Sequence, residues 1–141
     1  MTSNGAGTKK LGTFSWALWD WAEQPFPTIM QTFIFPVYLA GAVATAGDNA
    51  DTKLGWATTI AGILLALIAP VLGRRSDESG KRKFWLMVNT YVLVAIMVAS
   101  FFIEPKPEFF VMGLVLYGLG SVVQESAFIN YYAMLKSVTT E

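Results

Sequence analysis

The stretch LGWATTIAGILLALIAPVLGRRSDESGKRK, residues 54–83, decides the fold of this chain. Its first twenty residues, 54–73, carry no charged side chain, and its last ten carry seven; the next twenty residues, 84–103, are again uncharged. A helix of twenty residues is about 30 Å long, which matches the hydrocarbon thickness of a lipid bilayer. Each uncharged run therefore predicts a transmembrane helix, and the charged segment predicts a turn at the membrane surface.

Two more uncharged runs lie outward from this stretch. Residues 24–47 carry no charge, and residues 109–135 carry only Glu125. We expect an all-α membrane protein with four transmembrane helices at about 15–44, 54–73, 84–103 and 109–135, after a cytoplasmic N-terminal tail at 1–14. A soluble fold is disfavoured, because a chain of 141 residues has too little other protein to cover four apolar helices.

The basic residues predict the orientation of these helices. Only Lys53 and Lys106 fall on one side of the expected membrane. The other eight fall on the opposite side: Lys9, Lys10, Arg74, Arg75, Lys81, Arg82, Lys83 and Lys136. Because cytoplasmic loops are enriched in Lys and Arg, we expect a multi-pass protein of the cytoplasmic membrane with both termini of this segment in the cytoplasm.

The composition argues against several functional classes. Ten basic and ten acidic residues give zero net charge, and the basic run is explained by topology, so we expect no nucleic-acid partner. The chain has no cysteine and no histidine, which excludes disulfides, the usual zinc sites and Ser/His or Cys/His catalysis. We predict that the protein is not an enzyme and uses neither a metal nor a cofactor.

Polar residues inside the expected helices are the candidate functional groups. The first helix holds Asp20 and Glu23, and Gln31 extends the same polar strip. A carboxylate in a membrane helix costs on the order of 3 kcal/mol, so it usually faces a partner or water. The alternative is that both acids lie in the headgroup layer near the start of the helix. Three prolines also make this helix the most liable to bend.

The fourth helix holds a single carboxylate, Glu125, between long uncharged runs. An ionisable residue in such a position is a candidate for solute binding or proton coupling. The alternative is a structural ion pair with a basic residue elsewhere.

The charged segment resembles a known motif. Gly73, Asp77, Gly80, Lys81 and Arg82 look like the cytoplasmic loop motif G-x-x-x-D-[RK]-x-G-[RK]-[RK] between helices two and three of the major facilitator superfamily. The resemblance implies a conformational latch that controls the exchange between inward-open and outward-open states. Glu78 stands where the motif usually has a cation.

The first and fourth helices extend the resemblance. SWALWDWAEQPF is similar to the first helix of the family that includes the autophagy-related vacuolar amino-acid effluxers and bacterial "unknown major facilitator" proteins, and ESAFINYYAML is similar to a bacterial form of its fourth. The family usually has Asn at the positions of Glu23 and Tyr132. With this resemblance, the candidates for solute binding or proton coupling become Asp20, Glu23, Gln31, Glu125, Asn130 and Tyr131.

The resemblance implies the N-terminal portion of a secondary transporter that moves a small solute, with amino acids as the class it favours. Four helices would be the first two-thirds of a six-helix N-terminal half, so the expected partners are the bilayer, the solute, coupling protons and the missing C-terminal helices. Two alternatives stay open. One is a complete four-helix multidrug-type exporter that acts as a dimer and uses Glu23, and the other is a membrane scaffold without transport.

Overall fold

The computed structural model describes residues 4–45 and 47–139, and all regular structure in these residues is helical. The elements are α1 (Asn4–Glu23), η1 (Phe26–Phe33), α2 (Phe35–Tyr38), η2 (Leu39–Val43), α3 (Ala50–Ser79), α4 (Arg82–Phe101), η3 (Pro107–Phe109) and α5 (Phe110–Thr139). Four segments are long and apolar enough to cross a membrane, namely Gly12–Val43, Ala50–Arg75, Arg82–Phe101 and Pro107–Met134. The predicted all-helical fold with four spans is confirmed.

The first span is helical but irregular. Pro25, Pro27 and Pro36 have no backbone N–H to donate, so the regular ladder is interrupted at each of them. The chain continues through two π-helical segments, in which the Ile34 amide donates to the Ile29 carbonyl and the Ala44 amide to the Leu39 carbonyl, each at 2.9 Å. The expected irregularity therefore takes the form of widened turns. At its other end α1 begins at Asn4, within the segment expected as a tail.

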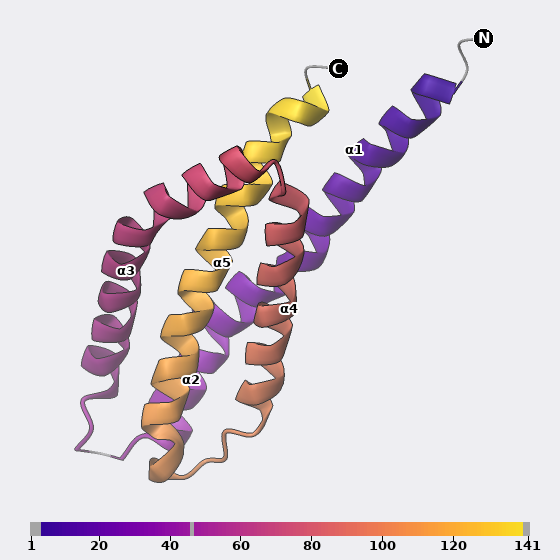
Figure 1. The fold of residues 1–141 in the computed structure, drawn as a ribbon. Helices are drawn as coiled ribbons and strands as arrows, with labels where there is room; N and C mark the ends of the chain where they lie inside the picture. Colours follow the sequence, from indigo (N-terminus) through magenta and orange to yellow (C-terminus); the bar gives the residue numbers. More distant parts are fainter. Residues whose placement is uncertain (1–3, 46, 140–141) are drawn as a thin grey trace.

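The helix α3 is longer than the uncharged run that predicted it. It begins at Ala50 and ends at Ser79, so it includes polar residues on both sides of the apolar stretch. Its interior holds Pro70, and Figure 1 shows α3 bent, with its C-terminal part leaning over towards α4. Gly80 follows with φ +61°, a left-handed conformation that favours glycine, and α4 starts two residues later.

The four spans run antiparallel along the chain, and α5 lies between α3 and α4 (Figure 1). The start of α1 and the end of α5 lie at the same end of the molecule as the turn between α3 and α4. The eight basic residues that predicted the cytoplasmic side belong to the elements that meet at this end, whereas Lys53 lies in the first turn of α3 and Lys106 directly precedes η3.

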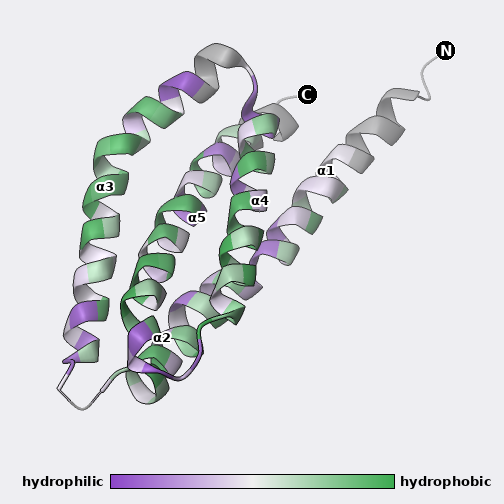
Figure 2. Cartoon of the chain, turned by 60° about the horizontal axis from the view of Figure 1, so that its bottom comes forward, coloured by the Kyte–Doolittle hydropathy of each residue, from purple (hydrophilic) through white to green (hydrophobic). Residues whose placement is uncertain are grey.

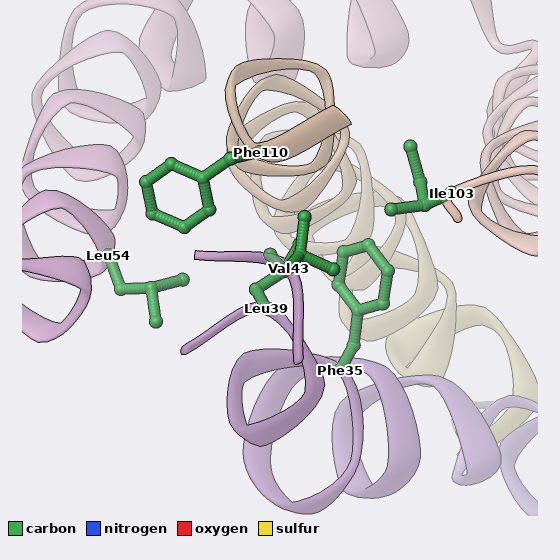
Figure 3. Packing of buried hydrophobic residues seen from close by; sticks show 6 residues of the cluster. All are labelled: Phe35, Leu39, Val43, Leu54, Ile103 and Phe110. Carbon is green, nitrogen blue, oxygen red and sulfur yellow. The ribbon is translucent and has the colours of Figure 1, made fainter. Parts of the chain in front are cut away.

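A cluster of buried apolar side chains packs at that other end. We call it the apolar cluster; its members are Phe35, Leu39, Val43, Leu54, Ile103 and Phe110 (Figure 3). The Tyr38 hydroxyl donates to the Ile103 carbonyl at 2.8 Å, which joins the first span to the end of the third. Beside the cluster, Lys53 Nζ donates to Asp48 Oδ1 at 2.7 Å and lies 5.2 Å from the centre of the Phe110 ring.

Much of the molecular surface is hydrophobic. Figure 2 shows hydrophobic residues over the outward faces of α3, α4 and α5, with hydrophilic residues at both ends of α3 and in the connection before α5. Phe101 keeps 84% of its surface exposed and Leu67 keeps 70%. Such a surface is unfavourable in water, so these faces require lipid or further protein around them.

Candidate functional site

The first span and α5 meet along an antiparallel line of contacts. Trp16 stacks on Tyr131, and seven residues further along α1, Glu23 contacts Gln124, which is seven residues earlier on α5. Residues seven apart lie on the same face of a helix, so one face of α1 meets one face of α5 in a single register. We call these four residues the polar seam.

One end of the polar seam is a carboxyl–amide pair, Glu23 with Gln124. The Gln124 Nε2 atom donates a hydrogen bond to Glu23 Oε1 at 2.6 Å. Glu23 is 9% exposed and Gln124 only 1%, although both are polar. The second oxygen of each side chain, Glu23 Oε2 and Gln124 Oε1, has no hydrogen-bond partner. The pair is therefore buried and only half satisfied, which is costly in a low-dielectric interior.

The other end of the polar seam is aromatic. The ring of Tyr131 lies 4.6 Å from both the Trp16 ring and the Trp19 ring, with interplanar angles of 7° and 30°. Trp19 Nε1 donates to Thr90 Oγ1 at 3.2 Å and so ties α1 to α4. The buried Trp16 Nε1 has no hydrogen-bond partner, and the Tyr131 hydroxyl lies near the Asp20 carboxylate without forming a regular hydrogen bond. This end thus offers polar atoms to a ligand within an aromatic wall.

Two more carboxylates lie around the carboxyl–amide pair. Asp20 is half-buried and Glu125 is exposed, and both are within electrostatic range of Glu23. Glu23 itself lies between two helices and contacts the side chain of Gln124. Across residues 4–45 and 47–139, no three acidic side chains are arranged to hold a metal ion.

Two other candidates lie outside this arrangement. The contact recorded for Gln31 is made by its backbone: its carbonyl accepts a hydrogen bond from the Tyr117 hydroxyl at 3.0 Å. Asn130 is buried, and its Nδ2 atom donates to the Ser126 carbonyl of its own helix at 2.9 Å. Of the six candidates, the structure therefore brings Asp20, Glu23, Glu125 and Tyr131 to the seam or its rim.

The structure describes the backbone of the whole latch motif, Gly73, Asp77, Gly80, Lys81 and Arg82, and the side chains of all but Asp77. Gly73 is inside α3, and Gly80 makes the left-handed turn between α3 and α4. Arg82 opens α4, and its Nη1 atom donates to the Ala133 carbonyl of α5 at 2.6 Å. Lys81 directly precedes α4, and the side chain of Asp77 lies outside the described residues.

Sequence reasoning missed Gln124 and the role of Trp19. Gln124 is uncharged, so it counted as part of the apolar run before Glu125. The equal spacing of seven between Trp16 and Glu23 and between Gln124 and Tyr131 was the available signal, but it becomes informative only when α1 and α5 are known to be neighbours.

No protein-family model matches this chain, and no solved structure matches it. The chain is similar to YxiO of Bacillus subtilis (strain 168), described as an uncharacterized MFS-type transporter, with 32% identity over 132 residues. The alignment covers 90% of this chain and 30% of that protein, so the chain spans about 30% of the length of this relative. The similarity supports membership in the major facilitator superfamily.

Proposed function

We propose that this chain is the N-terminal portion of a secondary active transporter of the cytoplasmic membrane that moves a small solute by alternating access. The observation that carries the proposal is the similarity to an MFS-type transporter along 90% of the chain. Amino acids as the solute class rest on the resemblance of the first and fourth helices to the amino-acid effluxer family. The termini of the segment are cytoplasmic in this proposal, since the basic residues gather at their end.

The geometry of the polar seam supports a transport role. A membrane-buried carboxylate is expensive, and such residues commonly mark solute and proton pathways. Glu23 is buried between α1 and α5, and Asp20 and Glu125 lie within electrostatic range of it. These two helices then form part of the wall of a solute cavity, and helices outside this chain supply the rest.

The contact of Arg82 supports a latch at the cytoplasmic end. Its hydrogen bond to the Ala133 carbonyl joins the turn after α3 to the last part of α5. A charge-assisted bond of this kind stabilises whichever transporter state contains it, so its loss shifts the balance between the two states. Asp77, Lys81 and the glycines Gly73 and Gly80 complete the latch in this proposal.

The test is solute flux by the full-length transporter in proteoliposomes, with a mixture of labelled amino acids as the probe and protein-free liposomes as the control. We expect flux above the control, and a several-fold change in its rate in Arg82→Gln. The Lys106→Gln variant is the matched control, because Lys106 lies at the opposite end and forms an exposed ion pair with Glu104. Absence of flux would favour a scaffold role and contradict the proposal.

A further inference from the structure

The carboxyl–amide pair has one hydrogen bond and two oxygens that no donor reaches. Gln124 Nε2 donates to Glu23 Oε1, and the two remaining oxygens, Glu23 Oε2 and Gln124 Oε1, are both buried without a partner. An ionised carboxylate and an amide carbonyl are both acceptors, so these two atoms cannot bond to each other. With a proton on the carboxyl group, one of them becomes a donor.

A protonated carboxyl group and a primary amide can exchange two hydrogen bonds in a ring. The amide N–H donates to the carboxyl C=O, and the carboxyl O–H donates to the amide C=O. The first of these bonds is present in the structure. We propose that Glu23 carries a proton on Oε2 at neutral pH and donates it to Gln124 Oε1, so that Gln124 is the residue that positions this proton.

The surroundings of Glu23 favour its neutral form. The ionisable groups that face it are Asp20 from α1 and Glu125 and Tyr131 from α5, and none of them is a cation. The ion pairs found in the described part of the chain do not include Glu23. A carboxylate that is removed from water, lies near other acids and has no ion-pair partner binds a proton in preference to remaining charged.

Proton binding forms the Oε2–H bond and removes one negative charge from the α1–α5 interface. Proton release restores the charge and breaks the ring, because the two oxygens then repel each other. A proton held in this way can be exchanged when the site opens to water. Its use as the coupling proton rests on the proposed transport function, whereas its presence does not.

Infrared spectroscopy of the full chain in lipid nanodiscs tests for this proton directly. At pH 7 we expect the C=O stretching band of a protonated carboxylic acid. Glu23→Gln should remove this band, because the side chain can no longer be an acid. This variant should still fold, since two amides can form the same pair of hydrogen bonds.

Three other variants separate Glu23 from its neighbours. Glu125→Gln and Asp20→Asn should keep the band, because both leave the carboxyl–amide pair intact. Gln124→Leu should shift the band, because the acid then loses its hydrogen bond to the amide. A wild-type chain without the band at pH 7, or a band that persists unchanged in Glu23→Gln, would overturn the proposal. A band without any solute flux would instead reject the transport function and leave the proton site standing.

Discussion

The polar seam and the apolar cluster are two ways in which the first span meets the rest of the bundle. At the seam, helix α1 presents Trp16 and Glu23 to α5. In the described part of the chain, four buried side-chain polar atoms have no hydrogen-bond partner, and all four belong to the polar seam. At the cluster, Leu39 is fully buried and Val43 is 1% exposed, and the cluster contains only apolar side chains. The apolar cluster is therefore held by contacts between apolar side chains, whereas the polar seam contains buried polar atoms without a hydrogen-bond partner.

Under the proposed function, this difference separates the residues that stabilise the bundle from the residues that take part in transport. Lipid chains are as apolar as leucine, so helices in a membrane associate through close packing and hydrogen bonds. The apolar cluster provides the packing at the end where the chain widens into π-helical turns. The polar seam keeps unsatisfied atoms in a costly environment, which is typical of sites that bind a ligand or proton.

The largest loss of stability should come from the apolar cluster. Leu39 is fully buried and covers Gly113 of α5 so closely that a Cβ atom there would clash with it. We expect Leu39→Ala to lower the free energy of unfolding by about 2 kcal/mol, because a cavity replaces this contact. Unfolding in detergent measures the change. Leu67→Ala is the control, because Leu67 is 70% exposed, and an equal loss in the two variants would contradict the assigned packing.

A smaller effect is expected where the two regions join. An added Cβ at Gly120 would lie 2.8 Å from Cζ of Phe26, a ring that is 5% exposed. Gly120→Ala should therefore cost about 1 kcal/mol of unfolding free energy through overpacking. At Gly62 an added Cβ meets nothing within 4 Å, so Gly62→Ala should cause no such loss. The prediction fails if the two substitutions have the same effect.

The smallest effect is expected in the connection next to the apolar cluster. Asp48 accepts hydrogen bonds from Lys53 Nζ and from the amide and hydroxyl of Thr45, which hold its pKa well below the ordinary 3.8. Because the pKa is lowered in the folded state, this contribution to stability is present above about pH 4 and is lost as the pH falls below that value. The contribution is small, because the ion pair is exposed.

Unfolding of Asp48→Asn and of the native chain at a series of pH values measures this contribution. The difference between the two should be largest near neutral pH and should shrink in acid. A difference that grows as the pH falls would show the opposite sign and contradict the assigned contacts.

The sequence was sufficient to predict four membrane-spanning helices, because each uncharged run is long enough to cross a bilayer. It did not predict the helix ends, since α3 and α5 continue into polar residues that a helix tolerates at the membrane surface. It predicted irregularity at Pro25, Pro27 and Pro36, but it did not predict that the irregular segments η1 and η2 would be π-helical.

The candidate site was predicted less completely, because it depends on the tertiary packing of α1 against α5. Glu23 and Glu125 are both visible as charged residues within expected membrane helices, and the sequence does not show which of them is buried. Only the packing of α1 on α5 distinguishes them, because it buries Glu23 and leaves Glu125 exposed. Gln124 could not be identified before that register was known.

The account's central claim is that the carboxyl–amide pair serves function rather than stability. The most direct measurement is made on Glu23→Gln in the full-length protein, and it compares solute flux driven by a proton gradient with the free energy of unfolding. We predict an unchanged free energy of unfolding, because the amide pair replaces the acid–amide pair, and a loss of gradient-driven flux of about tenfold or more. A folded Glu23→Gln variant that transports at the native rate with the native dependence on pH would contradict the claim.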